Sequence, residues 1–325
     1  MELPDTAVKT NAAEFEWPAG GLDFLWLELT GKCNLACVHC YAESHPLRPM
    51  YERMHPEDWK RVLAEAFAAG CRNVQFIGGE PTIYPHLASL IQFSRMLGYE
   101  FVEVFTNGTV FTEPLRRAFQ QFRVSLAFSI YGDTAAVHDS VTQSPGSFAK
   151  SMESIRWAVE NELPVRVGIV ETPQNAQSVE STRRFFEQIG VREVGVDRTR
   201  GIGRGTVAIR GSSDFDELCG NCWKGKLCVG PGGDMYPCVF SRSWKIGSAA
   251  EGVRAAIEGR PLADFRARLR RKVERELVNC VPARYPVDPG CQPDRQCNPG
   301  KSSMPGHAGK CNPHVDKCIP AKDAR

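Results

Sequence analysis

Three cysteines lie within eight residues near the start of the chain, Cys33, Cys37 and Cys40. Three thiolates at this spacing can bind three irons of a cubane iron–sulfur cluster, which leaves the fourth iron without a protein ligand. Such an iron can bind and activate a small molecule, whereas four-cysteine sites carry electrons or stabilise a fold. The alternative is a zinc site with His39 or His45 as its fourth ligand. The spacing predicts a reactive metal site and favours the cluster.

A second polar segment, Gly-Gly-Glu-Pro at 78–81, directly follows an apolar run at 73–77. Two glycines let the backbone approach a ligand closely. The carboxylate of Glu80 beside them can accept hydrogen bonds from an ammonium group. By itself the segment is weak evidence, since Gly-Gly turns after strands are common. Thr106-Asn107-Gly108 further along is, taken alone, typical of a turn.

Most of the thirteen cysteines lie in the last third of the chain, where nine occur between residues 219 and 318. One group is Cys219, Cys222, Cys228 and Cys238. A second group repeats Cys-x-Pro four times, at Cys291, Cys297, Cys311 and Cys318, and Cys280 precedes it. Proline after a ligand fixes φ and removes a backbone donor, which suits a tight metal-binding loop. The tail after residue 280 has few aliphatic residues, so we expect metal to stabilise it.

Composition and charge exclude several classes of protein. The formal net charge is +2 with mixed signs, which gives no reason to expect a nucleic-acid partner. No apolar run reaches the roughly 18 residues of a membrane span, and the start lacks the pattern of a signal peptide. We therefore expect a cytoplasmic protein without a membrane partner, whose cysteines bind metal rather than form disulfides. Cys71, in an alanine-rich stretch, is expected to be a buried small apolar residue.

Apolar runs alternate with helical patterns between residues 24 and 196, which indicates an α/β fold with a parallel sheet. The predicted strands are 24–30, 73–77, 101–106, 124–130, 165–170 and 193–196, and the predicted helices are 56–69, 86–97, 114–122, 147–160 and 178–189. Ser147 is the expected N-cap of its helix. Gly232-Gly233-Asp234 predicts a hairpin turn, and 262–277 predicts a further helix with a solvated basic face. Functional loops of such folds follow the C-terminal ends of the strands. The three-cysteine segment and Gly-Gly-Glu-Pro both lie at such ends.

The three-cysteine loop and Gly-Gly-Glu-Pro together resemble the radical S-adenosylmethionine (SAM) superfamily. The resemblance implies a partial (β/α)6 TIM-like barrel, a catalytic 4Fe–4S cluster on Cys33, Cys37 and Cys40, and SAM at the open iron. Reductive cleavage of SAM then gives a 5′-deoxyadenosyl radical that abstracts hydrogen from a substrate. The implied SAM-binding residues are His39, Tyr41, Gly78, Gly79, Glu80, Thr106, Asn107 and Ser129. One of Arg198, Arg200 and Arg204 is expected either to reach the SAM carboxylate or to be solvated.

The segment 222–238 resembles the opening of the SPASM or Twitch extension of this superfamily. Of the later cysteine spacings of a full SPASM domain, this chain keeps only Cys291-x5-Cys297. The resemblance implies one or two auxiliary 4Fe–4S clusters. We assign their ligands to the two groups of four cysteines, with Cys280 as a substitute for one of them. Zinc in the tail is the alternative.

The expected organisation is an N-terminal extension at 1–20, a radical SAM core at 21–205 and an auxiliary-cluster domain at 206–325. The resemblance implies an enzyme, in the oxidoreductase class, that modifies a ribosomally made precursor peptide by crosslinking, oxidation or epimerisation. The alternative is a small-molecule radical dehydrogenase or epimerase. Either enzyme needs an electron donor such as flavodoxin or ferredoxin. No catalytic residue beyond the cofactor sites is assigned from the sequence.

Overall fold

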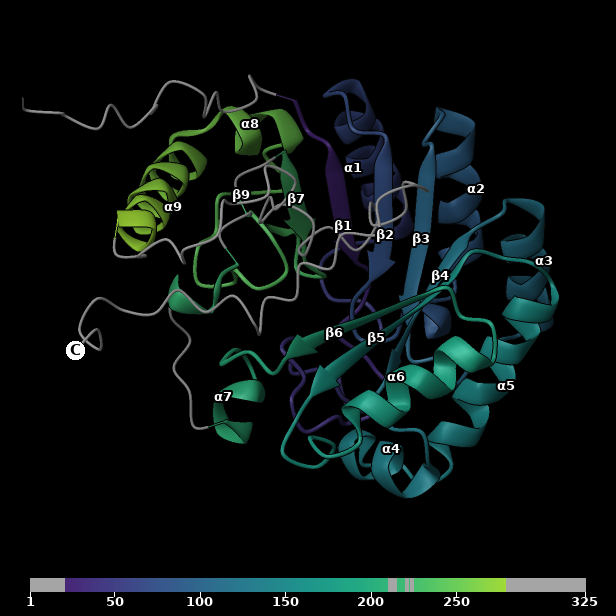
Figure 1. Cartoon of the computed structure of the whole chain (residues 1–325). Coiled ribbons are helices and arrows are strands. Elements are labelled where there is room, and N and C mark those ends of the chain that lie inside the picture. Colours follow the sequence, from purple (N-terminus) through teal and green to yellow (C-terminus); the bar gives the residue numbers. More distant parts are fainter. Residues whose placement is uncertain (1–20, 210–214, 220–221, 223–224, 279–325) are drawn as a thin grey trace, which may run out of the picture.

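The computed structural model describes residues 21–209, 215–219, 222 and 225–278 (Figure 1). The predicted extension at 1–20 lies outside these residues. So do five of the predicted ligands, namely Cys280, Cys291, Cys297, Cys311 and Cys318. Their assignments stay predictions.

Six parallel strands in sequential order form most of the sheet, so the predicted α/β fold is confirmed. They are β1 (Phe24–Glu28), β2 (Asn73–Ile77), β3 (Phe101–Thr106), β4 (Ser125–Ile130), β5 (Val165–Glu171) and β6 (Glu193–Arg198). The strand order is β6-β5-β4-β3-β2-β1-β7-β8-β9, so the sheet is an open partial barrel among the described residues. All loops that follow β1 to β6 therefore meet at one edge.

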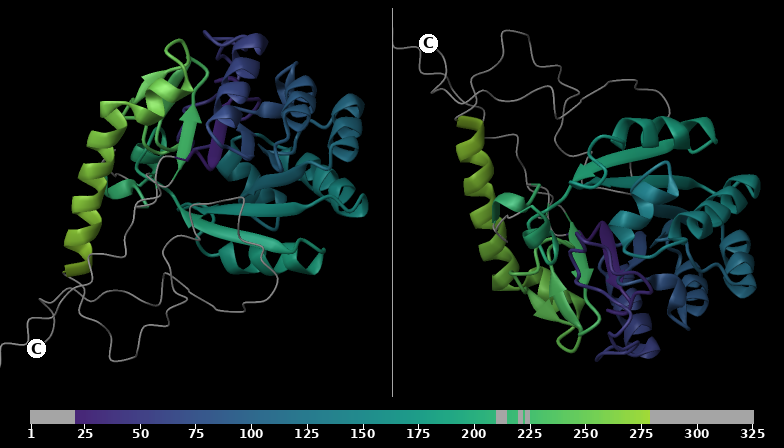
Figure 2. Two further views of the ribbon diagram at one scale, coloured as in Figure 1. Left: turned by 90° about the horizontal axis from the view of Figure 1, so that it is seen from above. Right: turned by 90° about the horizontal axis from the view of Figure 1, so that it is seen from below.

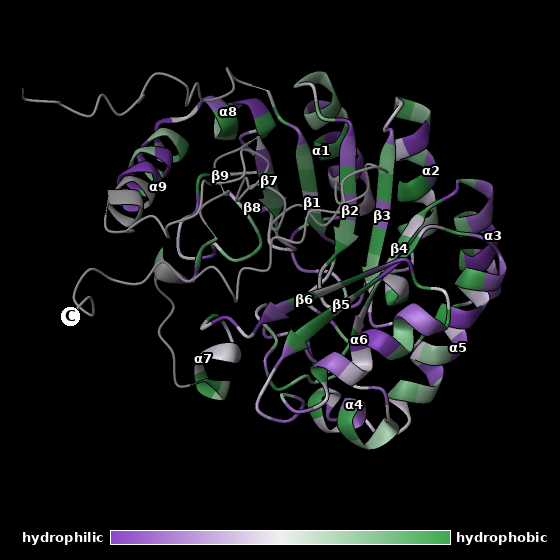
Figure 3. Cartoon of the chain, in the orientation of Figure 1, coloured by the Kyte–Doolittle hydropathy of each residue, from purple (hydrophilic) through white to green (hydrophobic). Residues whose placement is uncertain are grey.

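Helices connect these strands and cover the outer side of the sheet, as the two views in Figure 2 show. They are α1 (Pro56–Ala68), α2 (Leu87–Leu97), α3 (Glu113–Gln121), α4 (Ala135–Thr142), α5 (Ser147–Glu160) and α6 (Val179–Gln188). Each carries both hydrophobic and hydrophilic residues (Figure 3), and the apolar ones pack on the strands. The two-turn helix α4 was not predicted, because its short segment shows no helical periodicity.

The start of α5 corrects one expectation. Ser147 is the first residue of the helix and Gly146 is its N-cap. The capping oxygens belong to Asp139 of α4, which accepts hydrogen bonds from the backbone of Gly146 (2.6 Å) and Phe148 (2.9 Å) and from the Ser147 hydroxyl (2.8 Å). A longer-range carboxylate has replaced the local serine cap, because it satisfies two backbone donors at once.

Three further strands extend the sheet beyond β1. They are β7 (Lys226–Val229), parallel to β1, and the antiparallel strands β8 (Asp234–Tyr236) and β9 (Gly247–Ser248). The predicted hairpin turn is confirmed, and Gly233 adopts a φ of +82° there. The remaining helices are α7 (Gly205–Ala208), α8 (Val253–Glu258) and α9 (Arg260–Val278). The predicted domain boundary at residue 205 stays a prediction.

Candidate active site and neighbouring cysteine site

The three-cysteine loop follows β1 and is held by backbone hydrogen bonds to distant segments. The amide of Cys33 donates to the carbonyl of His45 (3.3 Å). The amides of Ala36 and Val38 donate to carbonyls near the end of α4, those of Thr142 (3.2 Å) and Val141 (3.0 Å). The helix that the sequence did not predict therefore fixes the loop's shape.

Cys33 and Cys37 of this loop lie in a setting that disfavours the charged form of their thiols when no metal is bound. Burial, reinforced by Glu80, raises the pKa of Cys33. Burial, reinforced by Cys40, raises the pKa of Cys37 to about 12. Thiolates are the form that ligates metal, so such a site needs a cation to hold them. No three His, Cys, Asp or Glu side chains in the described part of the chain converge on one metal ion.

The Gly-Gly-Glu turn packs directly on the strand that leads into the cysteine loop. The amides of Gly79 and Glu80 donate to the carbonyls of Thr30 (2.7 Å) and Lys32 (2.9 Å). A Cβ at position 79 would lie 1.9 Å from the Lys32 carbonyl oxygen, so only glycine fits without moving the backbone. Gly78 has a φ of +133°, which side chains rarely adopt. The two motifs therefore form one continuous backbone surface.

Glu80 joins this turn to the end of β3. Its carboxylate accepts from the Thr82 amide (2.9 Å) and hydroxyl (2.6 Å), the Thr106 hydroxyl (2.6 Å) and the Asn107 amide (2.8 Å). The side chain is 1% exposed. Burial raises the pKa of this carboxyl, and the bonds from Thr106 and Thr82 oppose the shift. In this structure Glu80 is a brace inside the protein, and its predicted contact with an ammonium group stays a prediction.

The predicted polar residues at the ends of β3 and β4 lie beside the cysteine loop. The Asn107 side-chain amide donates to the Cys33 sulfur (3.8 Å) and to the Asn34 side chain (3.0 Å). Ser129 lies next to Tyr131, whose hydroxyl also bonds to the Cys37 thiol and so opposes the rise in its pKa. Tyr131 was not predicted, because an aromatic residue after a strand carries no sequence signal of its own.

His39 packs edge-on against the Tyr131 ring at 4.8 Å, and its Nδ1 is buried without a hydrogen-bond partner in the described part of the protein. Burial, reinforced by Arg204, lowers the pKa of His39 to about 4, so the ring is neutral at pH 7. A neutral ring with an unused nitrogen can bind a polar aromatic group such as adenine.

Arg204, one of the three arginines of which one was expected to reach the SAM carboxylate or be solvated, contacts carbonyls of the cysteine loop, and the expected SAM contact stays a prediction. Its guanidinium donates to the carbonyls of Cys37 (2.8 Å) and Ser44 (2.8 Å), and its amide donates to the carbonyl of Cys40 (3.0 Å). A Cβ on the preceding Gly203 would lie 2.4 Å from the Tyr41 carbonyl oxygen. This Gly-Arg pair clamps the cysteine loop, and no local sequence pattern indicated it.

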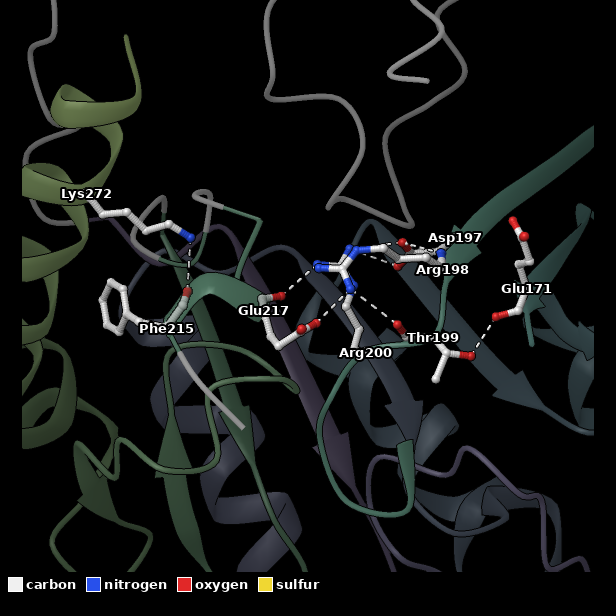
Figure 4. A network of polar contacts seen from close by, with 8 residues as sticks. All are labelled: Glu171, Asp197, Arg198, Thr199, Arg200, Phe215, Glu217 and Lys272. Atoms are coloured by element: carbon white, nitrogen blue, oxygen red, sulfur yellow. Dashed lines mark hydrogen bonds and ion pairs between the residues drawn. The ribbon is translucent and has the colours of Figure 1, made fainter. Parts of the chain in front are cut away.

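Arg200 and Arg198 connect the end of β6 to residues 215–217 (Figure 4). The Arg200 guanidinium donates to both carboxylate oxygens of Asp197, at 3.0 Å each. It also donates to the Glu217 carbonyl at 2.7 Å. Arg198 pairs with the Glu217 carboxylate at 2.9 Å. These contacts join the barrel to the second cysteine region.

Two of the predicted auxiliary ligands meet, and a third lies on β7, the strand beside β1. The sulfur atoms of Cys222 and Cys238 are 3.1 Å apart, and Cys228 lies in β7 opposite Trp26. All three thiols are buried. The shared hydrogen bond raises the pKa of Cys222 and lowers that of Cys238, so one of the pair is ready to lose its proton. Cys219 packs partly buried against the same core and is disulfide-bonded in this structure, against the expectation that the cysteines do not form disulfides, and its role as a cluster ligand stays a prediction. The chemistry of this donor set suits a thiolate-bound cluster.

Cys71 lies away from both sites. It is fully buried, and its thiol donates to the Asn73 carbonyl at 3.2 Å. Burial raises its pKa to about 12. The expectation of a small buried side chain is confirmed.

Residues 27–186 match the model of the radical SAM superfamily. Among curated proteins, the chain is 23% identical over 291 residues to the antilisterial bacteriocin subtilosin biosynthesis protein AlbA of Bacillus subtilis, covering 79% of this chain and 63% of that protein. It is 32% identical over 154 residues to the PqqA peptide cyclase of Rhodopseudomonas palustris, covering 46% and 39%. The chain thus spans less than two thirds of either relative.

The structure of Streptococcus suis SuiB bound to S-adenosylmethionine superposes with a TM-score of 0.62 over 76% of this chain and 68% of that one. At 15% identity this likeness shows the shared fold. The match to the family model shows that residues 27–186 are a radical SAM domain, and the superfamily's cofactors are SAM and a 4Fe–4S cluster. No helix in the described residues is long and apolar enough to cross a membrane.

Proposed function

We propose that this protein is a radical SAM enzyme that modifies a ribosomally made peptide. The observation that carries the proposal is the meeting of the three-cysteine loop, the Gly-Gly-Glu turn and Thr106-Asn107 at one edge of the sheet. Direct hydrogen bonds connect all three segments.

In this proposal Cys33, Cys37 and Cys40 hold the 4Fe–4S cluster, and the surface of Gly78 and Gly79 receives SAM. When bound, this cofactor pair supplies a 5′-deoxyadenosyl radical that removes a hydrogen atom from the substrate. Burial of Cys33 keeps water away from its sulfur. Asn107 orients Cys33 by its amide, and neutral His39 offers its free nitrogen to the bound nucleoside.

In this proposal the second cysteine site transfers electrons and does not bind SAM. Cys222, Cys228 and Cys238, with a further ligand, hold an auxiliary cluster. Removal of a hydrogen atom leaves one unpaired electron on the substrate, so a net two-electron oxidation needs an acceptor nearby. A thiolate-bound cluster suits that task because burial and hydrogen bonds adjust its potential.

A peptide substrate is supported by the relatives. The names of AlbA and PqqA peptide cyclase refer to a bacteriocin and to a peptide. Crosslinking, oxidation and epimerisation are the reactions considered, and each begins with hydrogen abstraction.

The test is to reconstitute the protein with iron and sulfide without oxygen, then add SAM and a reductant. The peptide encoded by a short reading frame beside the gene serves as substrate. We expect 5′-deoxyadenosine, and a mass change in the peptide of about two hydrogens for crosslinking or oxidation, or deuterium uptake from solvent for epimerisation. Formation of 5′-deoxyadenosine that responds only to a small-molecule substrate, with the peptide unchanged, would refute the peptide assignment and keep the enzyme class.

A further inference from the structure

A polar cluster with a buried carboxylate lies between the two cysteine sites. Its members are Tyr41, Glu28 and Arg242. The Tyr41 hydroxyl donates to Glu28 Oε1 at 3.1 Å, and the Arg242 guanidinium pairs with the same oxygen. The Arg242 guanidinium carbon also lies 5.1 Å from the centre of the Tyr41 ring. Each member thus contacts the other two.

This Tyr41–Glu28–Arg242 cluster reaches both sites through the chain. Tyr41 directly follows Cys40 of the first site. Arg242 follows Cys238 of the second site by four residues. Glu28 is two residues after Trp26, which pairs with Cys228 across β1 and β7. Side chains alternate along strands, so Glu28 and Cys228 share one face of the sheet.

The charges of the cluster act on the second site. Glu28 lies on the same face of the sheet as Cys228, and Arg242 lies on the segment that follows Cys238. The Glu28 side chain is 1% exposed and that of Arg242 is 27% exposed, so solvent screens the carboxylate little. Glu28 Oε2 and Arg242 Nε have no hydrogen-bond partner in the part of the chain that the structure describes. One polar atom of each charged group is therefore left without a hydrogen bond by the Glu28–Arg242 pair, and both charges can still act on groups nearby.

We propose that Arg242 and Glu28 set the reduction potential of a cluster bound at the second cysteine site, in opposite directions. A reduced cluster carries one more negative charge than an oxidised one. The guanidinium therefore favours reduction, and the buried carboxylate opposes it. Tyr41 is a positioning residue that orients Glu28 and fixes the first cysteine loop beside it. This inference rests on the auxiliary cluster of the proposed function.

The test is a potentiometric titration followed by electron paramagnetic resonance, on the full chain reconstituted with iron and sulfide. All variants are made in a Cys33→Ala/Cys37→Ala/Cys40→Ala background, so that auxiliary clusters alone are titrated. Arg242→Gln is expected to lower the midpoint potential by at least about 59 mV, a tenfold change in the reduction equilibrium for one electron. Glu28→Gln, which keeps the shape of the side chain, is expected to raise it.

Two further variants separate charge from structure. Arg242→Lys keeps the charge and is expected to restore most of the potential lost in Arg242→Gln. Arg254→Gln removes a charge that is 84% exposed and paired with Glu258 on α8, and it is expected to leave the potential unchanged. If Arg242→Gln does not fold, a rise in potential in Glu28→Gln supports the inference, and a fall or no change overturns it, while Arg242→Lys should keep the potential of the unsubstituted protein.

Shifts of opposite sign in Arg242→Gln and Glu28→Gln support the inference, since general loosening of the site would move both the same way. Shifts of equal sign, or none beyond that of Arg254→Gln, overturn it while the auxiliary cluster of the proposed function stands. A triple-alanine background that binds no iron overturns both.

Discussion

The two cysteine sites lie on either side of β1 but are built in different ways. The first gathers its thiols from eight consecutive residues in a loop after the strand, and distant segments hold that loop by its backbone. The second takes Cys228 from β7 itself, Cys238 from the segment after β8, and Cys222 from the approach to β7. The first site is a preformed loop that presents one face to a ligand. The second is part of the sheet and its hairpin.

This difference indicates different tasks. A site that must bind and release a small molecule needs an open side, and a loop at the edge of a parallel sheet supplies one. A site that only passes electrons can be enclosed by strands, where burial adjusts its potential. Each site can therefore be disabled by itself, and the following experiments test whether their roles separate.

Replacement of Cys33, Cys37 and Cys40 by alanine has the largest expected effect. The variant should form no 5′-deoxyadenosine, because no thiolate is left to hold the cluster. The measurement is chromatographic detection of 5′-deoxyadenosine after reduction with SAM present. Cys71→Ala is the matched control and should keep its activity, since that thiol only fills the core. Cleavage of SAM by the triple variant would disprove the role of the first site.

The iron that remains bound in the triple variant gives the number of clusters in the second cysteine region. We expect about eight irons if two auxiliary clusters are bound and about four if one is bound. Adding Cys228→Ser should lower the iron content by about one cluster, because serine is a poor ligand for iron. Anaerobic reconstitution with iron and sulfide assays supplies the numbers. Zinc in place of the residual iron would show that the second region stabilises the fold without carrying electrons.

The sequence predicted those parts of the two sites that depend on neighbouring residues, and it missed those that depend on contacts between distant elements. The strands, the Gly-Gly-Glu turn and the Gly233 hairpin show patterns among residues close in sequence, and the spacing of the three cysteines indicated a metal site but not the segments that hold their loop. Arg204, Tyr131 and Glu28 act on the cysteine loop from other elements, over separations such as the 167 residues between Arg204 and Cys37. No local pattern encodes such contacts. Asp139 displaced the predicted Ser147 cap for the same reason.

Glu80→Gln tests whether the negative charge of Glu80 contributes to SAM binding or whether the side chain only holds neighbouring segments together. A charge-assisted hydrogen bond is worth about 1.5–3 kcal/mol, so loss of the charge should weaken SAM binding at least about tenfold. Thr82→Val is the matched comparison, because it removes one internal donor to Glu80 and keeps the carboxylate. Calorimetric titration of SAM into the reconstituted protein gives both affinities. Equal weakening in the two variants would show that Glu80 acts as a brace alone.

The smallest expected effect concerns pH and the support of the first site. His138 lies on α4, the helix whose last carbonyls hold the cysteine loop, and its Nδ1 accepts the Tyr131 amide at 3.3 Å. Burial lowers the pKa of His138 from 6.5 to about 4. The unfolded chain therefore binds this proton first as the pH falls. The stability that neutral His138 supports is complete above about pH 6.5 and is lost as the pH falls toward 4.

Between pH 7 and pH 5 this linkage should remove about 2 kcal/mol from the free energy of unfolding. Urea denaturation at the two pH values measures it, and the triple-alanine background excludes any contribution from protonation of the first site's thiolates. His138→Gln cannot take up the proton, so its loss of stability over the same range should be smaller by about that amount. An equal loss in His138→Gln would place the acid sensitivity elsewhere. A smaller loss would show that the support of the first site, unlike the strand-borne second site, depends on a buried neutral histidine.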